Sequence, residues 1–212
     1  MNTEDFLVIG MSPGNGYFKQ DIVNQILEKY LLEYKNIGIF IPDVPAASTY
    51  IALGYSESVA LGKKAIPQGN ALKNKVLRFL EDKSLDKDSV KIFDWRKENI
   101  ESNSDYINAF GVVKSLYETN KLFRSDINET TEKVLVDNPF KKQDIGEKEI
   151  VIATHYILAE FAFMLFLPKY LNFSKFVYGY HKPWPVFEKF IAGFYDEVKK
   201  ESIEFLMLPE FS

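Results

Sequence analysis

The chain begins with a strand, a glycine-rich turn, a helix and a second strand, and this order restricts its fold more than any other feature. Residues 6–10 form a short apolar run, and a turn rich in Gly, Ser, Pro and Asn follows it. Apolar residues then recur at helical spacing over about 18–34, and a second buried strand is predicted over 37–41. A β-loop-α-β start is the right-handed unit of an open parallel sheet. We therefore predict an α/β fold with helices flanking such a sheet.

The remainder of the chain continues the same alternation. The expected helices cover about 47–62, 70–82, 104–136 and 149–167, with a further helix beginning at 183–185, and the expected strands cover 90–93, 175–180 and 204–208. Residues 137–147 are predicted to form a loop. No repeat or linker divides the 212 residues, so we expect one domain over 1–212.

Composition excludes several classes of protein. The chain has no cysteine, so it has neither a disulfide framework nor a thiolate metal site, and we expect no metal and no cofactor. Its first five residues lack the basic start of a signal peptide. The longest uninterrupted apolar run is 161–167, whereas a membrane-spanning helix needs roughly 20 residues. We expect a soluble, cytoplasmic protein without a membrane partner.

The turn after the first strand contains Gly-x-Ser-x-Gly, with Ser12 between Gly10 and Gly14. A strand-to-helix turn of this kind presents a serine hydroxyl and leaves backbone N–H groups free to bind an oxyanion. The turn is not a dinucleotide-binding loop, because Ser12 stands at the second glycine position, and it lacks the Gly-Lys-Ser/Thr of a phosphate-binding loop. A serine acyl hydrolase using Ser12 and His181 remains open, although α/β-hydrolases place several strands before their nucleophile.

Two later segments carry polar side chains that could face this serine. Tyr156 and Glu160 lie four residues apart on a predicted apolar helix, so they share one face. A carboxylate there is costly to bury unless it binds a cation such as the ammonium group of an amino acid. Tyr180 and His181 end the strand over 175–180, and the carboxyl ends of parallel strands meet at one edge of a sheet. Ser12 lies at that same edge.

Five basic residues and no acidic residue lie between residues 58 and 80, on a chain whose net charge is −4. They are Lys63, Lys64, Lys73, Lys75 and Arg78. Such a stretch is either a solvated helix face or a contact surface for a phosphate-bearing partner. The spacing alone leaves both interpretations open.

Taken together, these motifs resemble those of the cyclodipeptide synthases. The family has a Gly-x-Ser-Pro-x-Asn loop, a Tyr-x-x-x-Glu helix and a Tyr-His pair about twenty residues further on. This chain has them at 10–15, 156–160 and 180–181, and the segments 49–55 and 69–74 are also similar to family segments. The presence of Asn15, with the Tyr-His pair, resembles the subgroup named for Asn, Tyr and His. One departure is Gly16, where many members have serine.

The resemblance implies a single Rossmann-like domain similar to the catalytic domains of class I aminoacyl-tRNA synthetases. The implied activity is synthesis of a cyclic dipeptide from two aminoacyl-tRNAs by a ping-pong mechanism through acyl esters of Ser12. Tyr156 and Glu160 would hold the amino group, and Tyr180 would relay a proton or stabilise an oxyanion. Asn15, with Gly10 and His181 beside it, would position substrate. The enzyme would need no ATP.

The same resemblance assigns the remaining residues. The basic stretch would contact the acceptor arm of tRNA. The first amino-acid pocket would be lined by apolar and aromatic side chains, namely Val8, Phe163, Met164 and Tyr178. We therefore expect a hydrophobic product, with cyclo(Leu-Leu) as the specific prediction, made by a monomer. A non-catalytic tRNA-binding Rossmann domain is the second alternative.

Overall fold

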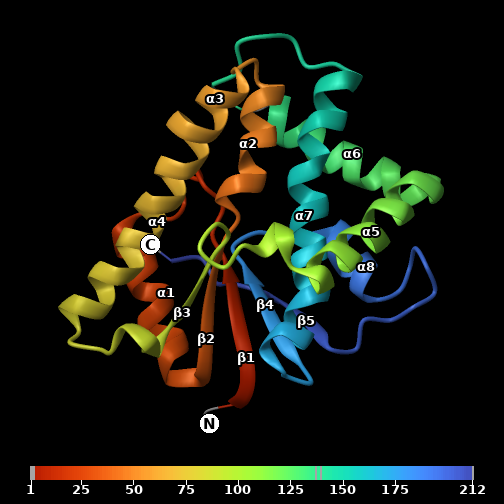
Figure 1. The fold of residues 1–212 in the computed structure, drawn as a ribbon. Coiled ribbons are helices and arrows are strands. Elements are labelled where there is room, and N and C mark those ends of the chain that lie inside the picture. Colours follow the sequence, from red (N-terminus) through yellow and green to blue (C-terminus); the bar gives the residue numbers. More distant parts are fainter. Residues whose placement is uncertain (1–2, 137, 139, 212) are drawn as a thin grey trace.

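The computed structural model describes residues 3–136, 138 and 140–211, and its centre is a five-stranded sheet (Figure 1). The strands are β1 (Thr3–Gly10), β2 (Tyr34–Ile41), β3 (Lys91–Asp94), β4 (Phe176–Tyr180) and β5 (Ile203–Met207). They lie in the order β3-β2-β1-β4-β5, and every neighbouring pair is parallel. The predicted α/β fold with an open parallel sheet is thus confirmed.

The helices follow the predicted positions closely, and most of the chain outside the sheet is helical. They are α1 (Gln20–Glu33), α2 (Asp43–Ala52), α3 (Glu57–Val59), the π-helix η1 (Ala60–Ala65), α4 (Ile66–Asp82), the 3₁₀ turns η2 (Lys87–Ser89) and η3 (Ile100–Ser102), α5 (Ser104–Thr119), α6 (Lys121–Val136), α7 (Glu147–Leu171) and α8 (Pro185–Ile191). Helices α3, η1 and α4 follow one another without a break, so residues 57–82 form one long helical segment.

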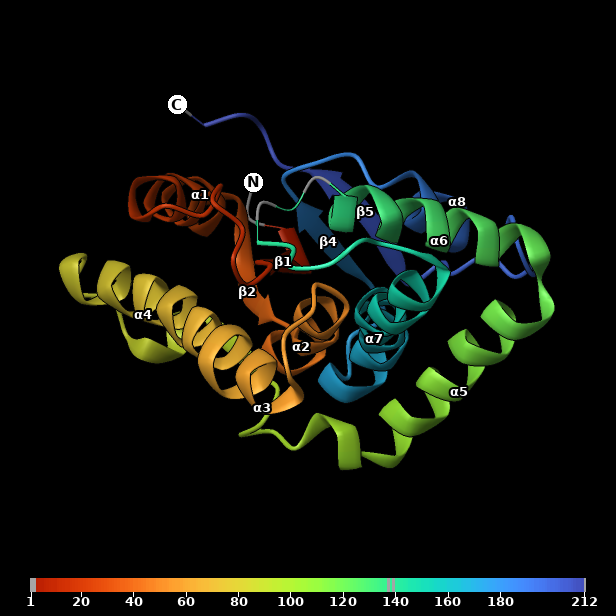
Figure 2. The same cartoon turned by 90° about the horizontal axis from the view of Figure 1, so that it is seen from above.

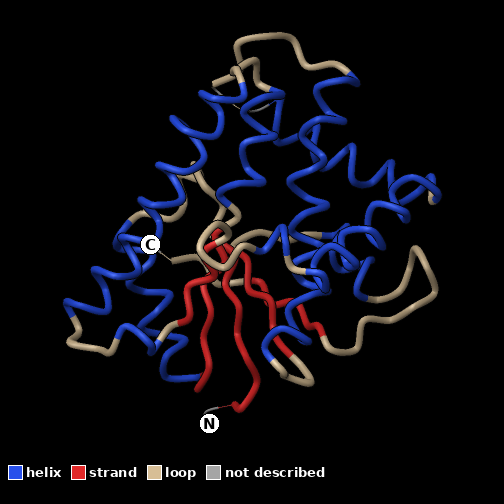
Figure 3. Tube along the Cα trace, viewed as in Figure 1, coloured by secondary structure: helices blue, strands red, loops and turns tan. Residues whose placement is uncertain are grey.

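The helices cover the sheet on both faces, as Figure 2 shows from above. Alternation along β1 explains the two layers, because successive side chains of a strand point to opposite faces. Leu7 and Ile9 join the core cluster beneath α1 and α4, whereas Phe6 and Val8 join the cluster beneath α7 and α8. Figure 3 shows the strands gathered at one end of the molecule, with helices and loops extending beyond their carboxyl ends.

Three predicted boundaries need correction. The helix expected over 47–62 is interrupted at 53–56, where Gly54 adopts a φ of +93° that favours glycine and ends α2. Of the predicted loop over 137–147, residues 137 and 139 lie outside the described residues, and α7 already begins at its last residue. The helix expected to end at 167 continues to Leu171 and contains Pro168.

Helix α7 is longer and more apolar than the sequence prediction allowed for, which bears on whether a segment of this chain could span a membrane. By length and composition it could cross a bilayer, with a mean hydropathy of 2.0 over an 18-residue window. The longest uninterrupted apolar run, 161–167, covers only part of this helix and therefore did not indicate its full apolar length. Of that window, 67% is buried inside the molecule, where α7 packs against α2, α5 and α6. Such burial is typical of the central helix of a folded core.

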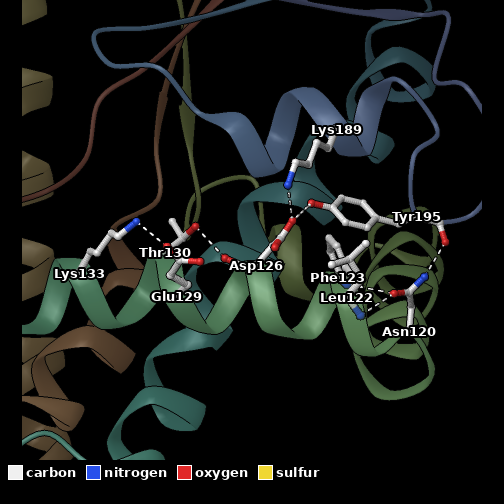
Figure 4. A network of polar contacts seen from close by, with 9 residues as sticks. All are labelled: Asn120, Leu122, Phe123, Asp126, Glu129, Thr130, Lys133, Lys189 and Tyr195. Atoms are coloured by element: carbon white, nitrogen blue, oxygen red, sulfur yellow. Dashed lines mark hydrogen bonds and ion pairs between the residues drawn. The ribbon is translucent and has the colours of Figure 1, made fainter.

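A polar network joins α6 to α8 and the turn after it (Figure 4). The Asp126 carboxylate accepts hydrogen bonds from Lys189 Nζ at 2.8 Å and from Tyr195 Oη at 2.6 Å. Asn120, at the start of α6, donates to the Tyr195 backbone oxygen at 2.7 Å. Burial opposes ionisation of Asp126, but the two donors hold its pKa below the usual value. The network fixes α8, which directly follows the predicted Tyr180-His181 site.

We expect Asp126→Asn to lower the free energy of unfolding by about 1–3 kcal/mol, because the part-buried Tyr195 hydroxyl loses its charged acceptor. Urea denaturation measures the change. Glu129→Gln is the matched control on the same helix, since Glu129 and Lys133 form an exposed pair at 2.7 Å. That pair should contribute at most about 0.5 kcal/mol. Equal losses in the two variants would contradict the assigned importance of Asp126.

Candidate active site

The structure brings the two predicted strand ends together at the point where the sheet order reverses. Strand β1 leads to β2 on one side and lies beside β4 on the other. Open α/β sheets bind ligands in the crevice at such a switch point, outside the carboxyl ends of the strands. Here the hydroxyl groups of Ser12 and Tyr180 lie 3.0 Å apart although 168 residues separate them in the chain. The predicted convergence of Ser12 and Tyr180 is confirmed.

The loop that carries Ser12 is held by the backbone and by Asn15. Gly14 has a φ of +79°, which only glycine adopts without strain, and Asn15 N donates to Ser12 O at 3.2 Å. Asn15 Oδ1 accepts from Tyr17 N at 2.9 Å, and Asn15 Nδ2 lies 3.2 Å from His181 Nε2. The His181 ring stacks on Tyr17, with centroids 4.3 Å apart. Asn15 thus connects the serine loop to the end of β4.

Two residues that sequence reasoning missed support this loop from α2 and α4. Tyr50 donates a hydrogen bond to Gln68 Oε1, and the pair lies against Gly14. A Cβ at Gly14 would come within 2.6 Å of Tyr50 Oη and 2.7 Å of Gln68 Oε1. Tyr50 falls in the segment 49–55 that resembles the family, which was the only available signal. No sequence signal pointed to Gln68, because its role depends on the approach of α4 to the loop.

Glu160 lies inside the protein rather than at its boundary. Its side chain on α7 is buried, and the residue is only 5% exposed. Burial raises its pKa to about 8, and the neighbouring Tyr156 hydroxyl offsets part of that rise. The carboxyl group is therefore mostly protonated at neutral pH until a cation arrives. A carboxyl group in this state can bind an ammonium group or exchange a proton with a substrate amine.

The charge of Glu160 acts on three tyrosine hydroxyls, those of Tyr156, Tyr178 and Tyr180. Burial and the charge of Glu160 raise the pKa of Tyr180 to about 12, so its hydroxyl keeps its proton and can donate to Ser12 or to an oxyanion. Tyr156 Oη and Tyr178 Oη are buried and have no hydrogen-bond partner among the described residues. The Tyr156 hydroxyl is close enough to Ser12 for the serine to influence its pKa, although burial dominates and raises it.

The geometry does not assemble the triad that a serine hydrolase requires. His181 Nε2 faces Asn15 rather than Ser12, and Nδ1 is buried with no hydrogen-bond partner in the part of the chain that the structure describes. A triad histidine needs a carboxylate at that nitrogen. Burial, and secondarily Lys182, lower the pKa of His181 to about 4, which makes it a weak base. The predicted pair of Ser12 and His181 therefore lacks the contacts of a hydrolase.

The four residues predicted to line the amino-acid pocket belong to one core cluster, and all four are fully buried. Val8 and Tyr178 are register partners on β1 and β4. Phe163 stacks on Phe40 at 3.9 Å between centroids, so it faces β2 rather than β4. Met164 lies in the same cluster. Their contact with a substrate stays a prediction.

The predicted tRNA-binding residues differ in what they contact. Lys73 Nζ lies 2.7 Å from Asp94 Oδ2, and Lys75 Nζ donates to the backbone oxygen of Phe18 at 2.5 Å. These two lysines have internal partners, which the prediction of a free basic face did not foresee. Arg78 is exposed and contacts Gln20, whose Oε1 lies 3.4 Å away. The other two lie on η1: Lys63 is exposed, and Lys64 sits 5.2 Å from the centroid of the Tyr55 ring.

No group of three or more His, Asp or Glu residues that could hold a metal ion occurs within 3–136, 138 and 140–211. The side chains that meet at the site supply hydroxyl, carboxyl and amide groups. These groups suit acyl transfer, in which a serine hydroxyl attacks an ester.

Both a family model and a curated protein are similar to this chain over most of its length. The family model described as cyclodipeptide synthase matches residues 1–199. A curated relative, the cyclo(L-leucyl-L-leucyl) synthase of Staphylococcus haemolyticus (strain JCSC1435), is 20% identical over 208 residues, which cover 96% of this chain and 87% of the relative.

Solved structures share the fold. A cyclodipeptide synthase from Staphylococcus haemolyticus has a TM-score of 0.84 and 18% identity, covering 98% of this chain and 92% of the other. A Mycobacterium tuberculosis protein, described as demonstrating that cyclodipeptide synthetases are related to type I tRNA synthetases, has a TM-score of 0.75 and 21% identity, covering 95% and 84%. A cyclodipeptide synthase from Candidatus Glomeribacter gigasporarum, bound to Phe-tRNAPhe, has a TM-score of 0.70 and 19% identity, covering 100% and 90%. The fold is thus the Rossmann-like fold of the family, as predicted.

Proposed function

The chain belongs to the cyclodipeptide synthase family, and from this we propose that it joins the aminoacyl groups of two aminoacyl-tRNAs into a cyclic dipeptide. The observation that carries the proposal is the contact of the Ser12 and Tyr180 hydroxyls at 3.0 Å beside the buried Glu160. An aminoacyl ester is already activated, so these groups suffice without ATP. The tRNA complex of the solved relative supports the same substrate class.

The first step of the proposed reaction acylates Ser12. Its oxygen attacks the ester carbonyl carbon, the bond from that carbon to the ribose oxygen of tRNA breaks, and the serine proton passes to the ribose oxygen. Tyr180, which keeps its proton, donates to the developing oxyanion or relays this proton. Glu160 and Tyr156 hold the α-amino group of the bound amino acid.

The second and third steps form the two peptide bonds. The amine of the second aminoacyl-tRNA attacks the Ser12 ester, the bond from the carbonyl carbon to the serine oxygen breaks, and dipeptidyl-tRNA forms. The freed Ser12 hydroxyl then attacks the ester of the dipeptidyl-tRNA, the bond to the ribose oxygen breaks, and the second tRNA leaves with the proton. The free amine of this dipeptidyl ester then attacks the ester carbonyl, which closes the ring and frees the serine hydroxyl. Glu160, with a pKa of about 8, accepts and returns amine protons at neutral pH. Asn15 positions the dipeptide.

We assign the chain to the Asn-Tyr-His subgroup, because Asn15 lies 3.2 Å from His181 and His181 directly follows Tyr180. We propose cyclo(Leu-Leu) as the product, on the basis of the apolar cluster and of the activity named for the curated relative. We also propose that a monomer with one domain over 1–212 acts in the cytoplasm.

The decisive experiment is expression in bacteria followed by mass spectrometry of the medium. A diketopiperazine, with the mass of cyclo(Leu-Leu) prominent, should accumulate with this chain and not with an empty plasmid. Purified protein supplied with leucyl-, phenylalanyl- or methionyl-tRNA then identifies the amino acids used. Absence of any diketopiperazine from both assays would exclude the proposed function.

We further expect the exposed members of the basic set to dock tRNA phosphates. Lys63→Glu with Arg78→Glu should weaken tRNA binding at least tenfold and make the dependence of affinity on salt shallower by about one unit per lost phosphate contact. Lys35→Glu, an exposed lysine at the start of β2, is the control. Binding titrations over a range of salt concentrations measure both effects. An unchanged salt slope in the double variant would remove these residues from the tRNA contact.

A further inference from the structure

The hydroxyl of Tyr178 is a polar group that the mechanism above leaves unused. Tyr178 lies on β4, has no exposed surface, and has no hydrogen-bond partner for its hydroxyl among the described residues. A buried hydroxyl without a partner is costly, and phenylalanine would fill the same space without that cost. A bound ligand would therefore supply the hydrogen-bond partner that this hydroxyl lacks among the described residues.

The position of this hydroxyl points to the site around Ser12. A Cβ built on Gly10 would lie 1.9 Å from Tyr178 Oη, so the tyrosine crosses from β4 to the end of β1. Gly10 stands two residues before the nucleophile. The absence of a side chain at Gly10 makes the room that the hydroxyl occupies. Trp184 and Phe187 pack against the Tyr178 ring at 6.0 and 5.6 Å between centroids, which keeps it in this direction.

A second buried hydroxyl lies in the same neighbourhood. It is Tyr156 Oη on α7, and it lowers the pKa of Glu160, which lies one helical turn further along α7. The charge of Glu160 acts on both tyrosines and contributes to raising the pKa of each, after burial itself. Tyr178 also acts on the pKa of Tyr156, as does Ser12, so the two hydroxyl groups and the Glu160 carboxyl group lie near one another and near Ser12.

The chemistry of these three groups matches one kind of ligand. An ammonium group has three N–H donors and no acceptor, and it is stabilised where a carboxylate and neutral oxygens surround it. We propose that Tyr178 is a further substrate-binding residue, whose hydroxyl accepts a hydrogen bond from the α-ammonium group of the aminoacyl substrate alongside Tyr156 and Glu160. This inference rests on the proposed function, and it gives Tyr178 a contact with the amino group rather than with the amino-acid side chain.

The experiment compares acylation of Ser12 by leucyl-tRNA and by the tRNA that carries the corresponding 2-hydroxy acid, which lacks the ammonium group. Intact-protein mass spectrometry follows the rate for the wild type, for Tyr178→Phe and for the control Tyr106→Phe, a buried tyrosine of the same core that packs on Trp95. Tyr178→Phe should slow acylation by leucyl-tRNA roughly tenfold to a hundredfold and acylation by the hydroxyacyl-tRNA less than threefold. Tyr106→Phe should leave both rates unchanged.

The outcomes separate this inference from the proposed function. Equal slowing with both tRNAs, or no slowing with either, would overturn the contact between Tyr178 and the ammonium group. Because the hydroxyl has no hydrogen-bond partner among the residues that the structure describes, the Phe variant should melt at the same temperature as the wild type or higher. A lower melting temperature would reveal a structural partner and also overturn the inference. Failure of the wild type to become acylated would instead refute the proposed function.

Discussion

Ser12→Ala is expected to reduce diketopiperazine formation by roughly a thousandfold or more, because it removes the atom on which both proposed acyl esters form. The Ser12 hydroxyl lies 3.0 Å from the Tyr180 hydroxyl. Loss of this contact should leave folding almost unchanged, so the effect falls on chemistry. Intact-protein mass spectrometry after mixing with leucyl-tRNA should detect a leucyl adduct on the wild type and none on the variant.

The control for this experiment is Ser104→Ala, which changes an exposed serine at the start of α5. The Ser104→Ala variant should still form both the leucyl adduct and the diketopiperazine. Circular dichroism and the melting temperature verify that the Ser12 variant is folded. An adduct that persists in Ser12→Ala, with product still formed, would mean that another residue carries the acyl group and would invalidate the ping-pong mechanism on Ser12.

The second large effect concerns the pH dependence of stability and follows from the burial of Glu160. Burial raises the pKa of this carboxyl group from 4.5 to about 8 in the folded protein. Between these two values the unfolded chain is ionised while the folded chain keeps the proton, so the folded state binds more protons and stability falls as pH rises. The contribution of Glu160 should decrease by roughly 3 kcal/mol between pH 5.5 and pH 8, at about 1.4 kcal/mol per pH unit.

Glu160→Gln isolates this contribution because it keeps the shape of the side chain and removes the titration. Urea denaturation of both proteins at pH 5.5 and pH 8 provides the measurement. The variant should be the more stable protein at pH 8, and the gap between the two should narrow toward pH 5.5. His181, whose pKa burial lowers to about 4, opposes this trend at acidic pH in both proteins, so it cancels in the comparison. A gap that does not change with pH would contradict a raised pKa for Glu160.

The sequence predicted the sheet well because short apolar runs between glycine- and proline-rich turns are compatible with few structures other than buried strands. All five predicted strands are present, and the end of β1 directly precedes Ser12. The helix ends that were predicted wrongly are those that depend on the conformation of single residues. Gly54 ends α2 through a left-handed conformation, and α7 passes through Pro168 before it ends at Leu171. Neither event changes the hydrophobic period from which the helices were predicted.

The contacts of the candidate site likewise fall into those that the sequence predicted and those that it did not. Motif order indicated that Ser12 and Tyr180 would meet, because the carboxyl ends of parallel strands share one edge. The contacts of Lys73 with Asp94 and of Lys75 with Phe18 were not predictable from a basic stretch. They arise where α4 approaches the residues just before α1 and the end of β3, and no local pattern records that approach.

The sequence by itself thus determined that a serine loop and a Tyr-His pair follow strands of a parallel sheet and that Tyr156 and Glu160 share one face of a helix, since the positions of strands and the side-chain period follow from local residue types. Only the tertiary structure decided that Glu160 is buried, that His181 faces Asn15, and that the Tyr178 hydroxyl rests against Gly10. The physical reason is that burial and protonation depend on which distant elements exclude water from a group, and that is a property of the packed fold rather than of any segment.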